Sequence, residues 1–273
     1  MKINNKNKLN LRSLYYLTLR YIFLKKYLKI YIHMLESEIK CHAKDVIGRH
    51  LYKYQNHEKD NTYYLLKNLS LKDGEIAIDI GANIGWFSIL LNRVSSPNAK
   101  IFSFEPNQNN YRLLVENLHK NKCYNVEAIA KAVSDKNGTG ELYIYPEKNS
   151  GRHSLLPSNG LSKKVVDTVA LNNFFEEYIY RKVKFLKLDI EGFEYFALKG
   201  SSKILEFVPL IMMELSPNLY PKNAGILEIL NLMYEKSYKA YRLCKGTLVN
   251  MSKDELLKLS YQTDIFWKKT STL

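Results

Sequence analysis

The stretch Ala77–Gly85, with the sequence AIDIGANIG, constrains the fold of this chain more than any other. The apolar run 76–80 enters a glycine turn, and residues 86–94 are rich in apolar and helix-forming side chains. This order is typical of a buried parallel strand, a tight turn and a helix. We expect Gly81 to adopt a backbone conformation that residues with a Cβ avoid, and Gly85 to let strand and helix pack closely. The pattern predicts an α/β protein with a ligand across the unpaired N–H groups of the helix start.

The residues of this turn favour one nucleotide ligand over another. Loops that bind nicotinamide or flavin dinucleotides usually carry a glycine where this chain has Asn83, because a pyrophosphate must approach the backbone there. Asp79, at the end of the strand, would repel a pyrophosphate but suits a cationic ligand. S-adenosylmethionine carries an ammonium and a sulfonium and no phosphate. Glu105 follows the next predicted strand, 100–104, where a carboxylate would hydrogen-bond both ribose hydroxyls. The sequence thus predicts S-adenosylmethionine rather than NAD.

Length and composition suit one α/β domain with an extension, since the chain has 273 residues, of which 46% are hydrophobic. The three cysteines, at positions 41, 123 and 244, form no Cys-x-x-Cys pair. This argues against a disulfide framework or a zinc cluster and predicts a cytoplasmic protein. The net charge of +14 points to an anionic partner, such as a nucleic acid, a membrane surface or an acidic glycan.

Residues 1–44 form a predicted basic helical extension, followed by a predicted domain over residues 45–273. The first 36 residues carry eight Lys and Arg, opposed only by Glu36, and no apolar run approaches the roughly 20 residues that span a bilayer. Arg12 and Arg20 interrupt the apolar segment, so a signal peptide is not predicted. The helix could lie on the inner face of an anionic membrane. Alternatively, it could pack on its own domain or on a second subunit. Its predicted apolar face consists of Leu14, Leu17, Tyr21, Leu24, Leu28, Tyr31 and Leu35.

Residues 37–71 are predicted to be mainly helical, with a polar break over residues 54–61 that contains His57 and Glu58. These two side chains could reach over the ligand site, although most surface His–Glu pairs are simply solvated. After the second strand the pattern predicts a helix over 109–121, a third strand over 126–133, and two further strands over 141–145 and 164–171.

The loop between the two further strands, residues 147–162, is polar and contains Arg152, His153 and Ser154. Loops carry function disproportionately, but an isolated exposed histidine is more often inert. Ala132, near the end of the third strand, falls where the adenine edge of a cofactor would meet the sheet.

Carboxylates occur at four successive predicted strand ends. In an open α/β sheet, ligands bind outside the carboxyl ends of the strands, near the topological switch. A single acid there would be weak evidence, and helix capping explains one of the four but not all. Lys187 shares a face with Asp189, because side chains alternate along a strand. The four acids are Asp79, Glu105, Asp189 and Glu214, the last two following or ending predicted strands over 183–188 and 209–215.

The chain resembles the FkbM-type, S-adenosylmethionine-dependent methyltransferases over roughly residues 45–268. The run Lys187-Leu-Asp-Ile-Glu-Gly-Phe-Glu194 is the most specific match, and Glu58 matches in the lead-in segment. Asn172 departs from the family, which usually has aspartate at that place, and the basic N-terminal region lies outside the resemblance. The other matching pieces are Ile78-Asp-Ile-Gly-Ala-Asn-Ile-Gly85, Phe104-Glu-Pro106 and Pro209-Leu-Ile-Met-Met-Glu214.

The resemblance implies a Rossmann-like class I methyltransferase fold, with a seven-stranded, mostly parallel sheet and helices on both faces. Residues 238–244 and 263–268 read as its closing strands, after a helix over 224–236. It also implies O-methylation, commonly of a sugar hydroxyl in a glycan, a glycolipid or a glycosylated metabolite.

In-line methyl transfer needs the acceptor oxygen held near the methyl group and a base for its proton. Asp189 is the first candidate for that base, followed by Glu214, Glu191 and His153, with Lys187 tuning the charge of Asp189. The predicted cofactor contacts are Asp79, Gly81, Ala82, Asn83, Gly85, Glu105, Pro106, Ala132, Asp189 and Glu58.

Three alternatives remain. Asp189 and Glu214 could hold a divalent metal beside the substrate oxygen, which we favour less because the ligand set is incomplete. A nucleic-acid methyltransferase would exploit the positive charge, but much of it lies outside the predicted sheet domain, and an Asn-Pro-Pro-Tyr-type motif is absent after the fourth strand. A non-catalytic glycan- or membrane-binding protein on this fold would lose cofactor contacts, whereas the set here reads as complete.

Overall fold

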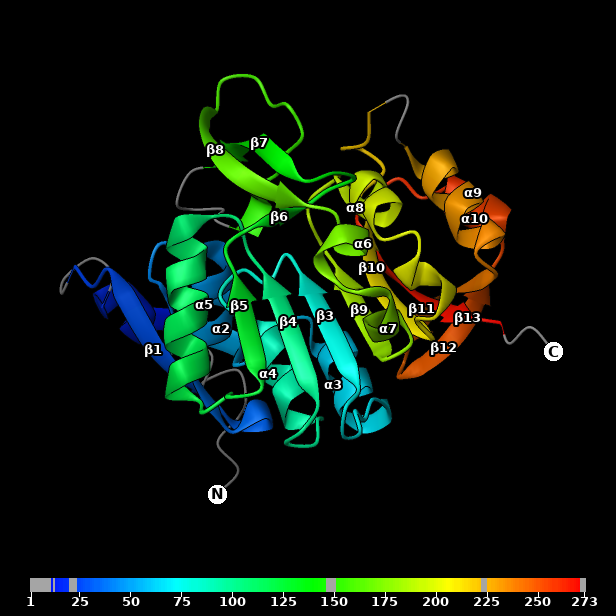
Figure 1. Cartoon of the computed structure of the whole chain (residues 1–273). Helices are drawn as coiled ribbons and strands as arrows, with labels where there is room; N and C mark the ends of the chain where they lie inside the picture. The colour runs from blue at the N-terminus through cyan, green and yellow to red at the C-terminus, as the bar shows by residue number, and fades with distance from the viewer. Residues whose placement is uncertain (1–10, 12, 20–23, 146–150, 222–224, 271–273) are drawn as a thin grey trace.

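The computed structural model describes residues 11, 13–19, 24–145, 151–221 and 225–270. Within these ranges, the central sheet has eight strands in the order β12-β11-β13-β10-β9-β3-β4-β5 (Figure 1). Strands β10, β9, β3, β4 and β5 run parallel, and β13 lies antiparallel between β10 and β11. The bounds are β3 (Ile76–Ile80), β4 (Lys100–Phe104), β5 (Val126–Ile129), β9 (Val183–Leu188), β10 (Leu210–Leu215), β11 (Tyr238–Cys244), β12 (Thr247–Met251) and β13 (Thr263–Lys269).

The predicted mostly parallel sheet is confirmed, with one strand more than the seven expected. The additional strand, β12, pairs antiparallel with β11 at the edge of the sheet. None of its five residues is buried, so it has no apolar alternation that could have signalled a strand. Its presence therefore follows from the tight turn at Lys245 and Gly246, both of which have positive φ and fold the chain back on β11.

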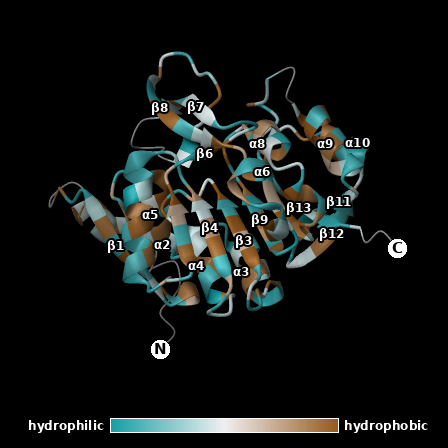
Figure 2. Ribbon diagram, viewed as in Figure 1, coloured by the Kyte–Doolittle hydropathy of each residue, from teal (hydrophilic) through white to brown (hydrophobic). Residues whose placement is uncertain are grey.

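Two hydrophobic cores lie on the two faces of the sheet, because side chains alternate along each strand. Ile76, Ile78 and Ile80 of β3 belong to one core and Ala77 to the other. Figure 2 shows hydrophobic residues along β3, β4 and β9. The helices on the isoleucine face are α6 (Leu171–Phe174), α7 (Glu177–Tyr180), α8 (Glu194–Gly200), α9 (Ile226–Glu235) and α10 (Lys253–Leu257), and those on the other face are α2 (Val46–Tyr54), α3 (Lys59–Asn68), α4 (Trp86–Arg93) and α5 (Gln108–Lys120).

A small second sheet lies over the carboxyl ends of the parallel strands (Figure 1). It consists of β6 (Ala132–Val133), β7 (Gly138–Ile144) and β8 (Ser162–Val169), in the order β6-β8-β7. The two further strands predicted from the sequence are thus confirmed. The single strand predicted over 126–133 is wrong, because the chain leaves β4 after Ile129 and continues as β6 alongside β8.

The N-terminal region contains the main departure from prediction. Residues 11 and 13–19 are helical, but residues 27–42 form an antiparallel hairpin of β1 (Tyr27–Ile32) and β2 (Ser37–His42). The predicted helix is therefore wrong over this range, as is the helical prediction for residues 37–42. In β1, buried and exposed residues alternate with the period of a strand, so Leu28 is buried and Lys29 exposed. Predicted face residue Tyr21 lies outside the described residues.

Side chains of α5 hold the hairpin against the domain. Asn117 Oδ1 accepts a hydrogen bond from the backbone N–H of Lys40 at 2.8 Å, and Asn121 Oδ1 accepts one from Glu38 at 2.9 Å. The inward residues of both strands share the core that α4 and α5 cover. These contacts favour a strand over a helix, because they give hydrogen-bond partners to backbone N–H groups along the free edge of β2.

Candidate active site

The glycine turn adopts the geometry expected from its sequence. Gly81, Asn83 and Gly85 all have positive φ, and the backbone N–H groups of Gly81 and Ala82 donate to the carbonyl of Phe104 at 3.0 Å each. A Cβ on Gly81 would lie 1.9 Å from the carbonyl oxygen of Asp189, and one on Gly85 would lie 2.8 Å from the Leu114 side chain. Gly81 is therefore required for conformation and for space, because it meets backbone, whereas Gly85 is favoured by its positive φ.

Glu105 follows β4, and its side chain lies against the glycine turn. Its Oε2 accepts a hydrogen bond from the N–H of Asn83 at 2.9 Å, and its Oε1 accepts one from the N–H of Asn107 at 2.8 Å. The side chain is 5% exposed, and this burial raises the pKa of Glu105 to about 7, against the opposing effect of the two N–H donors. The carboxylate is therefore rigidly placed, with lone pairs left to accept further hydrogen bonds.

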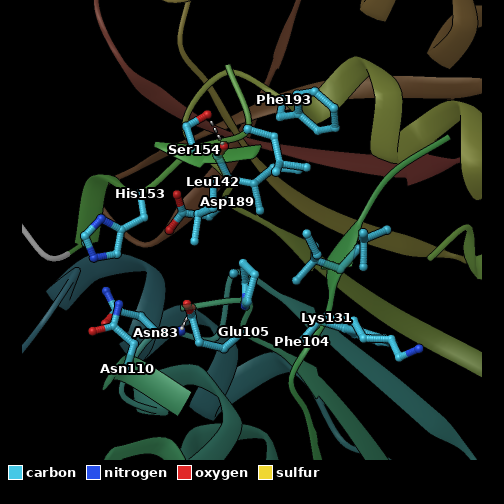
Figure 3. Close-up of a pocket in the computed structure, with 18 residues that line it drawn as sticks. Asn83, Phe104, Glu105, Asn110, Lys131, Leu142, His153, Ser154, Asp189 and Phe193 are labelled. Carbon is cyan, nitrogen blue, oxygen red and sulfur yellow. Dashed lines mark hydrogen bonds between the residues drawn. The ribbon is translucent and has the colours of Figure 1, made fainter. Parts of the chain in front are cut away.

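A first cavity, which we call the glycine-loop cavity, opens beside this turn (Figure 3). It holds about 570 Å³ of space between atoms, solvent at the mouth included. Asn83 and Glu105 lie on one side of it, and His153, Ser154 and Asp189 on the other. Apolar side chains complete the wall, among them Phe104, Pro106, Ala132, Val133, Leu142 and Phe193.

The segment after β9 folds into a tight turn around Glu194. Glu194 Oε1 accepts hydrogen bonds from the N–H groups of Ile190, at 3.2 Å, and Gly192, at 3.1 Å. Glu191 and Gly192 have positive φ, and Ser154 donates from Oγ to the carbonyl of Glu191 at 2.9 Å. The turn holds Asp189 at the strand end and directs Glu191 toward a second cavity.

Lys187, buried one residue before that strand end, links two of the predicted acids. Its Nζ donates to Asp189 Oδ2 at 3.0 Å, lies 3.9 Å from Asp79 Oδ1, and sits 4.9 Å from the ring centroid of Phe87. Burial alone would lower the pKa of Lys187, but the charges of Asp189, Asp79 and Glu58 outweigh it and raise the pKa above its ordinary value. Lys187 is therefore a permanent cation beneath Asp189.

Asp79 itself points into the protein rather than into a cavity. Its Oδ2 accepts a hydrogen bond from Ser88 Oγ of α4 at 2.7 Å, and the residue is fully buried. Burial raises its pKa, and the Lys187 charge and the Ser88 hydrogen bond oppose this. In this structure Asp79 joins β3 to α4 and balances Lys187.

A second cavity, which we call the carboxylate cavity, lies next to the first and holds about 840 Å³, open solvent included. Four residues line both cavities: Gly81, Asn83, Gly151 and Asp189. Five carboxylate side chains line the second, together with the basic side chains of Lys187 and Arg152 and the rings of His57, Trp86 and Phe87. The five acids are Asp45, Glu58, Asp189, Glu191 and Glu214.

Crowding of these acids shifts their protonation. Burial, followed by the charge of Asp189, raises the pKa of Glu214 to about 9 and that of Glu191 to about 7. Burial also raises the pKa of Glu58 to about 7. Gln262 Nε2 donates to both Glu191 Oε2, at 2.8 Å, and Glu214 Oε2, at 3.2 Å. Oxygen atoms of Asp189, Glu191 and Glu214 lie within 4.8 Å of one another, which is close enough for all three to ligate one divalent cation.

Comparison with known proteins places this site in a family. Residues 79–243, more than half of the chain, match the family described as the methyltransferase FkbM domain. The chain belongs to the FkbM methyltransferase family. The solved structure of methyltransferase FkbM from Methylobacillus flagellatus KT superimposes with a TM-score of 0.51 at 14% identity, over 96% of this chain and 58% of that one. This similarity confirms the class I methyltransferase fold.

Two curated relatives of this FkbM-family chain are informative. The hexuronic acid methyltransferase AglP of Haloferax volcanii is 25% identical over 152 residues, which cover 56% of this chain and 60% of AglP. The 31-O-demethyl-FK506 methyltransferase FkbM of Streptomyces tacrolimicus is 30% identical over 111 residues, which cover 40% of this chain and 41% of the relative. The chain thus spans less than two thirds of the length of either relative.

The FkbM-family structure divides the predicted cofactor contacts between the two cavities. Gly81, Asn83 and Asp189 line both, and Ala82 and Glu58 line the carboxylate cavity. Neither Asp79 nor Gly85 is among the lining residues of either cavity; both shape the turn from behind. The predicted contacts that line the glycine-loop cavity alone are Glu105, Pro106 and Ala132.

The predicted catalytic residues also separate. Glu191, Glu214 and Lys187 line the carboxylate cavity with Asp189, whereas His153 lines the glycine-loop cavity. Nδ1 of His153 accepts a hydrogen bond from the N–H of Tyr145 at 3.1 Å, and burial lowers its pKa to about 4. Its ring is neutral at pH 7 and carries its proton on Nε2, so it has no free lone pair to accept another. It is neither exposed nor isolated.

The structure corrects the interpretation of two residues at the site and adds others that were not predicted. His57 and Glu58 are only about a quarter exposed, so the solvated-pair interpretation is wrong for both. Asp264 of β13 lies opposite Glu214 in the antiparallel register and accepts a hydrogen bond from Asn61 Nδ2, which also donates to Glu58. Sequence spacing gives no signal for such a group, because β10 and β13 are far apart in the chain. Trp86 and Phe87, which open α4, were predicted only as part of an apolar, helix-forming segment, with no role at the site.

Proposed function

We propose that this chain is an S-adenosylmethionine-dependent O-methyltransferase, with the cofactor in the glycine-loop cavity and a hydroxyl acceptor in the carboxylate cavity. One observation carries the proposal. The two cavities share a wall formed by the glycine turn and Asp189, so a group held in one directly adjoins the other. Methyl transfer requires this arrangement, because donor carbon and acceptor oxygen must meet in line.

The residues present fit the cofactor. Glu105 is fixed by two backbone N–H groups and retains acceptor capacity suited to ribose hydroxyls. The buried side-chain oxygen of Asn83 has no hydrogen-bond partner among the described residues, and a bound ligand could donate to it. Ala132, Leu142 and Phe193 supply an apolar wall that suits an adenine ring. S-adenosylmethionine supplies the electrophilic methyl group.

Asp189 is the best-placed base in the proposed reaction. It is the carboxylate that lines both cavities, and Lys187 donates a hydrogen bond to its Oδ2. Glu214 is largely protonated at neutral pH, because its pKa is raised to about 9. It can therefore donate a hydrogen bond to the hydroxyl oxygen of the substrate rather than act as the base. Asp189 would take the hydroxyl proton, and Glu214 and Glu191 would orient the acceptor.

We propose a sugar hydroxyl in a glycan, glycolipid or glycosylated metabolite as the acceptor. A sugar ring has hydroxyls that can hydrogen-bond to acidic side chains and apolar C–H faces that can pack on aromatic rings. The acids of the carboxylate cavity and the rings of Trp86 and Phe87 suit both features. The relative AglP is a hexuronic acid methyltransferase. A nucleic-acid acceptor is disfavoured, because a phosphate backbone would meet a predominantly acidic cavity. The cytoplasm is the proposed site of action.

Calorimetry with purified protein tests the cofactor, and transfer of a labelled methyl group to extracts of cell-envelope glycans tests the acceptor. We expect binding of S-adenosylmethionine or S-adenosylhomocysteine in preference to NAD, and label in a glycan fraction. Tighter binding of NAD would contradict the cofactor assignment. Label that enters RNA and no glycan fraction would contradict the acceptor class.

A further inference from the structure

Exposed leucines gather on the helical segment at residues 11 and 13–19. Leu11, Leu14 and Leu17 recur every third residue on one face and are 66%, 64% and 46% exposed, and Leu24 is 78% exposed. Exposed side chains of this size, in a group, indicate an interaction surface. We define the N-terminal patch as Leu11, Leu14, Tyr15, Leu17, Leu24, Lys25, Lys26 and Lys44, all of which are exposed.

The patch is held in place by contacts on its inner side. Tyr16 is 1% exposed, and its hydroxyl donates to the carbonyl of Ala43 at 2.6 Å. The N–H of Lys25 donates to the carbonyl of Leu19 at 3.1 Å, and the N–H of Ala43 donates to Lys26 at 2.9 Å. The leucines are thus exposed on a segment that is packed on the domain, and the exposed lysines belong to the stretches of chain joined by these hydrogen bonds or adjacent to them.

Positive charge is concentrated in the same part of the chain. Residues 1–54 contain twelve Lys and Arg against three Asp and Glu, a net charge of +9 out of +14 for the whole chain. An apolar face bordered by lysines is the composition that lies in the interface of an anionic bilayer. A symmetric contact between two copies would instead oppose the patch to itself, with the basic groups of both copies close together and few acids to offset them.

We propose that the N-terminal patch binds the surface of an anionic phospholipid bilayer, with the leucines in the headgroup region and the lysines on lipid phosphates. None of the described helices has the length and hydropathy to cross a bilayer, so this is binding to the surface. The surface role goes beyond the proposed function and does not depend on it.

Helix α2 connects the N-terminal patch with the carboxylate cavity. The ring of Tyr52, in α2, lies 6.3 Å from that of Tyr15 and 5.8 Å from that of Tyr16. At the other end of this helix, Val46 and Ile47 line the carboxylate cavity. The helix has 9 residues, so about 14 Å separates the two ends. Given the proposed function, the bilayer would bring an acceptor carried on a lipid close to the cavity.

Co-sedimentation of the full chain with vesicles tests the proposal. We expect binding to vesicles of phosphatidylglycerol and phosphatidylcholine, weakened by salt, and none to phosphatidylcholine alone. The variants Leu14→Asp/Leu17→Asp and Lys25→Glu/Lys26→Glu should each weaken binding by about tenfold or more. The control Leu257→Asp/Lys258→Glu, which changes an exposed leucine and lysine of the α10 region, should bind like the wild type.

Two further measurements decide the outcome. Each variant should keep wild-type affinity for S-adenosylmethionine, which shows that the fold is intact; a wild type that binds vesicles but no cofactor would contradict the proposed function alone. The bilayer proposal would be overturned if the wild-type protein did not bind anionic vesicles, or if the patch variants bound them like the wild type. Sedimentation velocity in which Leu14→Asp/Leu17→Asp converts a dimer to a monomer while vesicle binding is unchanged would also overturn it, since the patch would then join two copies.

Discussion

The two cavities are built in different ways. The glycine-loop cavity takes much of its shape from backbone: positive-φ turns, N–H groups that hold Glu105, and Gly81, where a Cβ would meet the carbonyl oxygen of Asp189. The carboxylate cavity is built from charged side chains on segments dispersed from Asp45 to Glu214. Backbone hydrogen bonds and turns thus define much of the first cavity, whereas side chains that can be substituted define much of the second. Under the proposed function, cofactor and acceptor would depend on different residues, so substitutions can test the two cavities separately.

The largest expected effect concerns Asp189, the acid among the four residues that line both cavities. Asp189→Asn should lower methyl transfer by about 10²–10⁴, the range for loss of a general base, with cofactor affinity near wild type. Single-turnover transfer and calorimetry measure the two quantities. Asp167→Asn, at an exposed position of β8, is the matched control. Full turnover in Asp189→Asn would move the base to Glu191 and make Asp189 a positioning residue.

A second variant addresses the glycine-loop cavity alone. Glu105→Ala should weaken binding of S-adenosylmethionine, since each charge-assisted hydrogen bond lost is worth roughly 1.5–3 kcal/mol. Glu105→Gln keeps the shape and one carbonyl oxygen, and should weaken it less. Calorimetry is the measurement, and Glu127→Ala, at an exposed position of β5, is the control. Unchanged affinity in Glu105→Ala would assign the ribose contacts to another residue.

A third experiment uses the raised pKa of Glu214 in the carboxylate cavity. The folded protein keeps the Glu214 proton up to a pKa of about 9, whereas the unfolded chain loses it near 4.5. Unfolding therefore releases a proton between these values, and stability falls as pH rises from about 4.5 to 9. Glu214→Gln should make this fall of Tm shallower, with each kcal/mol worth about 2–4 °C. Calorimetric scans across pH measure Tm for the wild type, for Glu214→Gln and for the control Glu127→Gln. Parallel curves of Tm against pH for the wild type and Glu214→Gln would contradict the raised pKa of Glu214.

The smallest effect is expected from a chelator. If Asp189 acts as the base without a metal, EDTA should leave turnover unchanged. The close approach of Asp189, Glu191 and Glu214 makes the opposite result informative. Activity lost to EDTA and restored by Mg²⁺ or Mn²⁺ would convert the carboxylate cavity into a metal-assisted site.

The contrast between the cavities extends to what could be predicted. The strand, turn and helix around Gly81 and the acids at Glu105 and Asp189 were found from sequence, because the residues that determine them are contiguous or end parallel strands. The N-terminal hairpin was missed. Leucine spacing near residues 28–35 fits a helix face, but Asn117 of α5 and Asn121, which follows it, provide hydrogen-bond partners for a strand.

The sequence by itself determined the α/β class, the glycine turn and the alignment of acids at one edge of the sheet, since short-range periodicity and parallel strand ends suffice for these. Only the tertiary structure decided that Glu214 faces Asp264, that His57 and Glu58 are enclosed, and that Asp189 lines two cavities. The physical reason is that antiparallel pairing and loop packing join segments distant in the chain. Their free energy depends on packing and desolvation between those segments, which no local window of sequence contains.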